Sequence, residues 1–166
     1  MLELNKSVQH LQSINIQDEY GTPKKEYENA CKKYNIHPLT DVCASDINHM
    51  CDSYITKSQD CFNFPILVDF YMNPPYSIVS ECIKFAFEQH RKHNVSGLIL
   101  TYSKTDTKWW HQYVEPWAVH FIKGRLQFND ENGIPTVNKN EQSKAFGKKQ
   151  SAPYPSCWII FRNTEK

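Results

Sequence analysis

The sequence predicts an α/β fold, in which helices cover a mostly parallel sheet that ends in an antiparallel edge. Apolar runs typical of buried strands alternate with segments of helical periodicity, the pattern of α/β proteins. The closing part of the chain is rich in strand patterns, which suggests the antiparallel edge. At 166 residues and 40% hydrophobic content, the chain is long enough for one well-buried core and too short for two ordinary domains. We expect a single domain at 18–166 after an N-terminal extension at 1–17.

The first half of the chain predicts one helix and two strands. "GTPKKEYENACKKYN" reads as a helix, with Thr22 as its N-cap and Pro23 at the first helical position, where the missing N–H costs nothing. "HPLTDVCAS" predicts a short strand that ends near Cys43. "FPILVDFYM" is apolar and rich in strand-favouring residues, as in a strand covered on both faces.

The second half continues the alternation. "SIVSECIKFAFEQHRKH" has helical spacing of its apolar residues, with Ser77 available as a cap. "VSGLILTYS" predicts a buried strand, and "TDTKWWHQYV" a short helix capped by Thr105 or Asp106. "AVHFIKGRLQF" predicts two strand pieces broken at Gly124, and "SCWIIFR" a last strand.

Residues 129–155 lack a periodic apolar pattern. A loop of this length inside a compact domain is usually functional or disordered. It carries several lysines and is the longest polar stretch of the chain.

The charge balance excludes a strongly basic nucleic-acid binder. The net charge is +1 and the pI is near 7.6, so any DNA contact must use local patches. Each such patch has the simpler interpretation of a solvated face. The candidates are Lys24, Lys25, Lys32 and Lys33 on the first predicted helix, and Lys144, Lys148 and Lys149 in the late polar stretch.

Neither a membrane span nor a secretory signal is visible, because no run of about eighteen apolar residues occurs and the N-terminus lacks a basic-then-apolar order. We expect a cytoplasmic protein, in a prokaryote or a virus-infected host cell. The six cysteines contain no C-x-x-C pair, and reduced thiols are the expected state. A zinc site using Cys43, His49, Cys51 and Cys61 is the less favoured alternative, so we predict no metal site.

The segment "DFYMNPPYS" contains the most informative motif. Two consecutive prolines cannot continue a central strand, so the strand must stop at Met72 or Asn73. Asn73 then offers a side-chain carbonyl and Pro74 a backbone carbonyl, which together suit an amino group with two hydrogens, while Tyr76 can stack on a base. The alternative is a proline turn that leads into a helix.

The chain resembles the phage-type, Dam-like DNA adenine N-6 methyltransferases. The likeness rests on "DEYGTP", "TDVCAS", "NPPYS", "TDTKWWHQYV", "FIKGRLQF" and "APYPSCWIIF", in this order over nearly the whole chain. It implies a Rossmann-like fold dependent on S-adenosyl-L-methionine (SAM), DNA as partner, and methyl transfer to the exocyclic amino group of adenine. The single domain is then a methyltransferase domain.

The resemblance also implies roles for individual residues. A DNA-recognition element is expected in the 129–155 loop, and the oligomeric state stays open. Implied at the cofactor are Thr22, Pro23, Asp41, Cys43, Ala44 and Asp60, and in the catalytic motif, Asn73, Pro74, Pro75 and Tyr76. The DNA contacts are not part of this likeness: because little chain separates the cofactor turn from the motif, we expect them from the loop, through Lys144, Lys148 and Lys149.

The sequence departs from most SAM enzymes in one respect and leaves three alternatives open. No glycine lies between Gly21 and Gly97, so Ala44 and Ser45 must form the cofactor turn. Too few residues separate Ala44 from Pro65 for a full βαβ unit of about 30 residues, which predicts a reduced sheet. The alternatives are a cytosine N-4 methyltransferase, a protein glutamine methyltransferase, and a non-catalytic nucleic-acid-binding protein on a methyltransferase scaffold.

Overall fold

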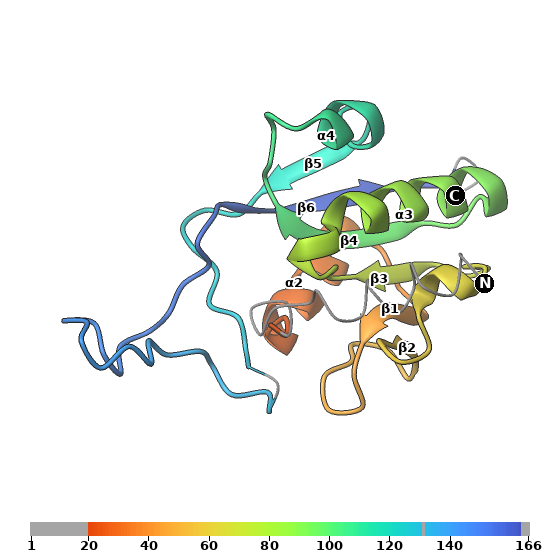
Figure 1. The fold of residues 1–166 in the computed structure, drawn as a ribbon. Coiled ribbons are helices and arrows are strands. Elements are labelled where there is room, and N and C mark those ends of the chain that lie inside the picture. The colour runs from red at the N-terminus through yellow and green to blue at the C-terminus, as the bar shows by residue number, and fades with distance from the viewer. Residues whose placement is uncertain (1–19, 131, 164–166) are drawn as a thin grey trace, which may run out of the picture.

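A six-stranded mixed sheet forms the centre of the computed structural model, which describes residues 20–130 and 132–163 (Figure 1). The strand order is β2-β1-β3-β4-β6-β5. β2, β1, β3 and β4 run parallel, β6 is antiparallel to β4, and β5 is antiparallel to β6. The bounds are Thr40–Ala44 (β1), Ser53–Thr56 (β2), Phe70–Met72 (β3), Gly97–Tyr102 (β4), Ala118–Phe121 (β5) and Ser156–Phe161 (β6). The predicted α/β class and antiparallel edge are confirmed.

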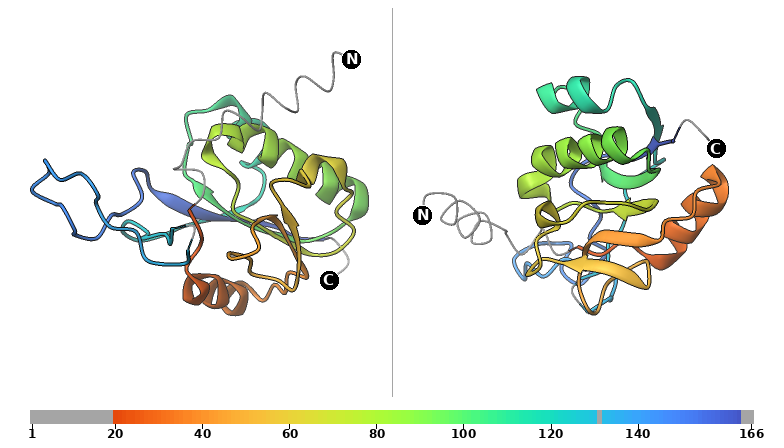
Figure 2. Two further views of the ribbon diagram at one scale, coloured as in Figure 1. Left: turned by 60° about the horizontal axis from the view of Figure 1, so that its bottom comes forward. Right: turned by 90° about the vertical axis from the view of Figure 1, so that its right-hand side faces the viewer.

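Helices cover both faces of the sheet. α2 (Lys24–Tyr34) lies on one face, while α3 (Val79–His93) and α4 (Lys108–Tyr113) lie on the other (Figures 1 and 2). Two 3-10 turns, η2 (Cys61–Asn63) and η3 (Tyr76–Ile78), complete the elements. None of the helices in the described part of the chain has the length and apolar character that a membrane crossing requires.

The core is divided into two layers by the sheet. Successive side chains of a strand point to opposite faces, so Phe70 and Met72 join the cluster beneath α3, while Tyr71 joins the cluster beneath α2. Gly97 makes room for this packing, because a Cβ there would lie 2.5 Å from the Phe70 ring. β3 is therefore fully enclosed, as the sequence predicted for a central strand.

The sheet is reduced where the sequence predicted it. The connection from β1 to β2 is an irregular loop from Ser45 to Asp52 with no helix. The short strand β2 extends the sheet beyond β1 but was not predicted, because "SYIT" is too short to stand out as a periodic pattern.

Two predicted strands are wrong in their extent. β3 begins only at Phe70, and Leu67 and Val68 before it are exposed. Pro65 lacks the N–H that strand pairing needs. The piece expected after Gly124 does not join the sheet. Gly124 has a φ of 84° and turns the chain away from β6.

The predicted cap of α2 is also wrong. Pro23 occupies the N-cap position in an extended conformation, with no side-chain cap hydrogen bond. The hydroxyl of Thr22, which we expected to cap the helix, instead forms a buried 2.5 Å hydrogen bond with the hydroxyl of Tyr71. Thr22 is thus tied to β3 rather than to its own helix.

The remaining two caps differ from the sequence prediction as well. Ser77 lies inside the η3 turn, and α3 begins after it with Ile78 at the N-cap position. Thr107, rather than Thr105 or Asp106, precedes α4, and its hydroxyl donates to the carbonyl oxygen of Lys104. In both cases a turn precedes the helix, so the helix begins later than the cap residue predicted. Local cap patterns do not reveal such a turn.

Residues 129–155, which we call the arm, form an irregular hairpin that projects from the sheet (Figures 1 and 2). Isolated bridges pair Asn129 with Pro135 and Val137 with Lys149. Buried Thr136 joins the two sides, because its N–H donates to Phe128 and its carbonyl accepts from Gln150. The stretch without a periodic pattern therefore has backbone pairing at its base.

Candidate functional site

The parallel strands end together at one end of the sheet, which we call the carboxyl end. The turn after β1, the Asn73–Tyr76 motif after β3 and Ser103 after β4 all lie there. β1 is flanked by β2 and β3, so the chain moves outward in opposite directions from β1 and β3. Such a switch point opens a crevice beyond the strand ends, where α/β sheets bind ligands. The structure brings the predicted cofactor turn and catalytic motif to this point.

Asn73 is held in one orientation by the segment before α2. Its Nδ2 donates to the carbonyl oxygen of Tyr20 at 2.9 Å. Because that carbonyl only accepts, the amide cannot be flipped. Oδ1 is buried and has no hydrogen-bond partner among the described residues. An acceptor in this condition calls for an explanation, since buried polar atoms are nearly always paired.

The segment Tyr20–Thr22 connects the motif to both the turn after β1 and the arm. Gly21 exchanges two backbone hydrogen bonds with Asn129, at 2.9 and 2.8 Å. A Cβ on Gly21 would lie 2.1 Å from Nδ2 of Asn48 in the turn. The close approach explains why a residue without a side chain stands here.

Asp41 shapes the turn after β1 through its side chain. Its two carboxylate oxygens accept hydrogen bonds from the N–H groups of Cys43 and Met50, at 3.2 and 3.0 Å. Burial raises its pKa to about 7, against the lowering effect of these bonds and of nearby His49. Since both oxygens already bind the backbone, Asp41 positions the turn itself.

The other predicted cofactor residues lie around the same turn. Ala44 is buried at the end of β1, and Cys43 is partly exposed. Asp60 precedes η2 with a φ of 60°, a left-handed value that is rare outside glycine, and its Oδ1 accepts from the N–H of Phe62. Strained backbone of this kind tends to occur at functional sites.

Tyr76 belongs to an aromatic cluster that the sequence did not reveal. Its ring stacks on Tyr102 with centroids 3.7 Å apart and planes at 13°, and it meets Phe128 edge-on. Phe128 stacks with Tyr20, and Tyr102 contacts Tyr154. The cluster joins the Asn73–Tyr76 motif to both sides of the arm's base. Its members are spread from 20 to 154, so no local pattern predicts their meeting.

The predicted DNA-binding lysines all belong to the arm. Lys144, Lys148 and Lys149 are exposed, and the arm extends away from the sheet (Figure 1). Exposed Phe146 lies between Lys144 and Lys148 in the sequence. The lysines therefore belong to a different segment from the Asn73–Tyr76 motif, which follows β3.

Comparisons with known proteins identify the family of this chain. The DNA N-6-adenine-methyltransferase (Dam) family matches residues 10–165. The chain belongs to this family. It is also similar to a protein of Haemophilus phage HP1 named DNA N-6-adenine-methyltransferase, with 28% identity over 143 residues, or 84% of this chain and 83% of that protein. The resemblance predicted from the six sequence fragments is confirmed.

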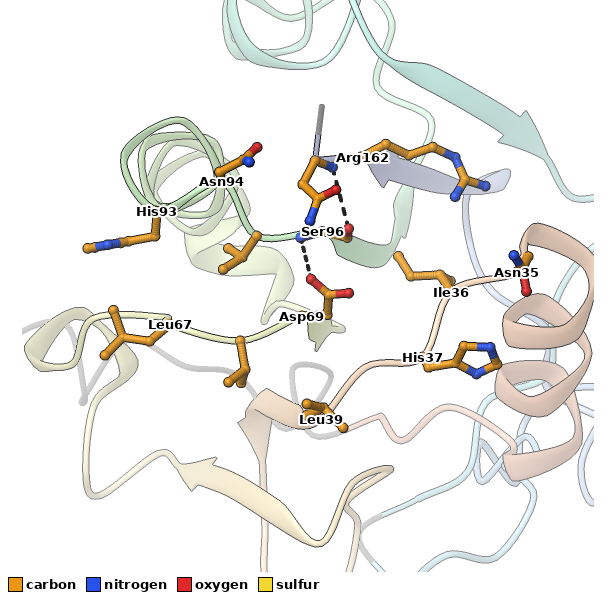
Figure 3. Close-up of a pocket in the computed structure, with 13 residues that line it drawn as sticks. Asn35, Ile36, His37, Leu39, Leu67, Asp69, His93, Asn94, Ser96 and Arg162 are labelled. Atoms are coloured by element: carbon orange, nitrogen blue, oxygen red, sulfur yellow. Dashed lines mark hydrogen bonds between the residues drawn. The ribbon is translucent and has the colours of Figure 1, made fainter. Parts of the chain in front are cut away.

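A separate cavity, away from the predicted site residues, is drawn in Figure 3. This cavity of about 660 Å³ lies at the opposite end of the sheet, the amino end, beside Leu39, Asp69 and Ser96, which precede β1, β3 and β4. The N–H of Ser96 donates to Oδ1 of Asp69 within it. No residue that the sequence predicted for the site lines this pocket.

The zinc site considered as an alternative, which would use Cys43, His49, Cys51 and Cys61, is not supported by the geometry. Within residues 20–130 and 132–163, no group of three or more histidine, cysteine, aspartate or glutamate side chains is arranged to hold a metal ion. His49 instead stacks on Tyr54, and its Nδ1 is 2.9 Å from the carbonyl oxygen of Cys51.

Proposed function

We propose that this Dam-family chain is a SAM-dependent DNA methyltransferase that modifies the exocyclic amino group of adenine, on a reduced Rossmann-like fold. The parallel order β2-β1-β3-β4 is that of doubly wound sheets with a switch point between β1 and β3. The family match and the phage relative support the substrate class.

The observation that carries the proposal is the buried Oδ1 of Asn73. Tyr20 accepts from the amide nitrogen, so the oxygen is the atom of Asn73 left to bind a ligand. An exocyclic amine carries two hydrogens and fits two acceptors. We assign the second acceptor to the backbone carbonyl of Pro74, whose direction the proline ring restrains.

The carboxyl end also suits the cofactor. SAM supplies a methyl group bound to a positively charged sulfur. The unpartnered Asn73 oxygen is an acceptor there that a bound ligand would satisfy. We expect the backbone of the turn that Asp41 holds to bind it. The residues that would hold the cofactor are Thr22, Pro23, Asp41, Cys43, Ala44 and Asp60.

Catalysis on this geometry is mainly a matter of positioning. An adenine leaves its base stack at a cost of about a few kcal/mol and stacks on the face of Tyr76 turned away from Tyr102. Asn73 Oδ1 and the Pro74 carbonyl would accept its two amino hydrogens, which would orient the amino nitrogen for methyl transfer. The excess proton leaves to water, and no cysteine nucleophile is needed.

The arm is the proposed DNA-recognition element. Lys144, Lys148 and Lys149 in the arm supply phosphate contacts, which position DNA without reading its sequence. Its base is connected to the catalytic motif through Phe128 and Tyr154, so DNA bound along the arm would lie in register with the carboxyl end.

Labelled SAM, with DNA, RNA and a glutamine peptide as acceptors, tests the function. The expected product after digestion of the DNA is N6-methyladenine. N4-methylcytosine, labelled peptide, or SAM binding without any product would replace the proposal by one of the alternatives given above.

A further inference from the structure

The amino-end cavity is built from segments that precede the parallel strands and end the helices. Leu39, Asp69 and Ser96 stand before β1, β3 and β4, and the C-cap residues Asn35 and Asn94 end α2 and α3. Its volume of about 660 Å³ is in the range of small-molecule sites. The proposed methyl transfer makes no use of this cavity.

Two residues that line the cavity have a buried polar atom with no hydrogen-bond partner in the part of the chain that the structure describes. These atoms are Oδ1 of Asn163, which follows β6, and Nε2 of His93, at the end of α3. The N–H of Asn163 donates to Oγ of Ser96 at 3.4 Å, which ties Asn163 to the segment before β4. The Asn163 oxygen accepts hydrogen bonds, and a histidine nitrogen donates or accepts according to its tautomer. Because buried polar atoms are nearly always paired, a bound ligand would explain both.

Two cations meet at Tyr34, beside the cavity. The guanidinium of Arg162 donates to the carbonyl oxygen of Tyr34, and Nζ of Lys33 lies 5.1 Å from the centre of the Tyr34 ring. Arg162 lines the cavity, and its side chain points toward Asn35 and away from His93 (Figure 3). A guanidinium has five N–H donors in a planar fork that suits phosphate, and the Tyr34 carbonyl occupies only part of them. This side of the cavity therefore suits an anionic group.

The other side of the cavity suits an uncharged group with donors and an apolar face. The carboxylate of Asp69, whose Oδ1 accepts the N–H of Ser96 at 2.7 Å, attracts hydroxyl and amino donors and repels phosphate. Exposed aliphatic side chains that line the cavity can contact the flat face of a base; they are Leu39, Leu67 and Val68. A phosphate thus fits beside Arg162, and a sugar and base fit toward Asn163 and His93.

We propose that the amino-end cavity is a second ligand site, which binds a free nucleoside monophosphate. Its phosphate contacts Arg162 and Lys33, and its base lies against the exposed aliphatic side chains. Asn163 Oδ1 accepts a hydrogen bond from an amino or hydroxyl group of the nucleoside. The site does not depend on the proposed methyl transfer, because it lies at the end of the sheet opposite to the Asn73–Tyr76 motif.

Calorimetry of the full chain with adenosine monophosphate (AMP), adenosine and inorganic phosphate tests the ligand class. AMP should bind at least about tenfold more tightly than adenosine, since charged hydrogen bonds to its phosphate are added. Absence of AMP binding, or equal affinities for AMP and adenosine, would overturn the proposal. Inorganic phosphate that binds as tightly as AMP would also overturn it, because the nucleoside would then contribute nothing.

Two variants separate the parts of the ligand. Arg162→Ala should lower the affinity for AMP about tenfold, to that for adenosine, and leave adenosine binding unchanged. Asn163→Leu should weaken AMP and adenosine by the same factor. The matched control is Arg125→Ala, because Arg125 is also exposed and its Nη1 also donates to a backbone carbonyl, that of Pro153.

The control variant should bind AMP like the unmodified protein, and circular dichroism checks that each variant is folded. Lys33→Ala provides the same test of the phosphate contact if Arg162→Ala does not fold. Equal losses of AMP affinity in Arg162→Ala and Arg125→Ala would overturn the assignment of the phosphate to this cavity.

Hydrogen–deuterium exchange with AMP locates the ligand. Slower exchange is expected at 35–39 and 93–97, with no change at 73–78. Slower exchange at 73–78 alone would place AMP at the carboxyl end and contradict the proposal. A single-stranded oligonucleotide is the second probe, and slower exchange at 35–39 with it but not with AMP would mean that the cavity recognises nucleic acid instead. If SAM does not bind the protein, the proposed function fails while the AMP result stands.

Discussion

The two ends of the sheet differ, because one has an open cavity and the other has the Asn73–Tyr76 motif. The amino end has an open cavity lined by residues such as Leu39 and Ser96, but none from the motif. The carboxyl end has the motif, the switch point and an unpartnered buried acceptor, but Tyr76 is stacked against Tyr102. An open cavity and a chemically equipped site thus lie at opposite ends.

The largest expected effect is that of Asn73→Ala. Removing one preorganised acceptor should lower the methylation rate by about 10²–10³-fold, while SAM affinity and the unfolding midpoint stay near those of the unmodified protein. The matched control is Asn29→Ala on the exposed side of α2, which should be fully active. A fully active Asn73→Ala enzyme would remove the reason for preferring the carboxyl end.

The next effect concerns DNA affinity. Replacing Lys144, Lys148 and Lys149 together by alanine should weaken DNA binding at least about tenfold. The slope of log binding constant against log salt concentration should also become less negative, by about 0.9 for each phosphate that the protein no longer neutralises. SAM affinity should not change. The control is alanine at Lys24, Lys25 and Lys32, which are equally exposed on α2. If alanine at the three α2 lysines weakens DNA binding more than alanine at the arm lysines, DNA binds on a different face of the protein.

A smaller effect is expected at Tyr102, which holds the ring of Tyr76. Tyr102→Phe retains the stack and should stay within about twofold of full activity, whereas Tyr102→Ala should lose up to about tenfold in kcat, in line with the roughly 0.5–1.5 kcal/mol of an aromatic pair. Both are assayed at a temperature where circular dichroism shows the alanine variant folded. Equal losses in the two variants would mean that the hydroxyl matters and the stack does not.

The last prediction concerns pH and stability. The native pKa of Asp41 is about 7, against an ordinary value of 3.8. Between these values the native state keeps a proton that the unfolded state has lost, so this residue's contribution to stability is full below about pH 4 and is lost as pH rises through about 7. Each pKa unit corresponds to about 1.4 kcal/mol.

Urea unfolding of Asp41→Asn measures this dependence. Because the variant cannot ionise, its stability relative to the unmodified protein should improve from about pH 5 to about pH 8. Asp52→Asn, at an exposed position nearby, should show no such trend. If the free energy of unfolding differs between Asp41→Asn and the unmodified protein by the same amount at both pH values, the buried carboxyl does not titrate in this range.

Sequence patterns predicted the features of this fold that depend on neighbouring residues. The strand "VSGLILTYS" and the helix that begins at Val79 both rest on local periodicity, and the proline pair correctly ended β3 after Met72. The helix caps failed because turns preceding each helix are set by tertiary contacts, as with the Thr22–Tyr71 hydrogen bond. Local propensity is overridden in such cases.

The candidate site was predictable as a set of residues but not as an arrangement. The motif at Asn73 and the acid at Asp41 stand out in the sequence, whereas the bond that orients Asn73 comes from Tyr20, 53 residues earlier. The aromatic cluster likewise joins distant segments. Contacts of this kind depend on the strand order, which local periodicity does not specify.

Hydrogen–deuterium exchange with and without SAM compares the two ends of the sheet in one measurement. The account predicts slower exchange in the turn at 42–50 and in the motif segment at 73–78, with no change at 93–97. Slower exchange around the amino-end pocket, with none at the turn and the motif, would contradict the central claim that the cofactor binds where β1 and β3 end.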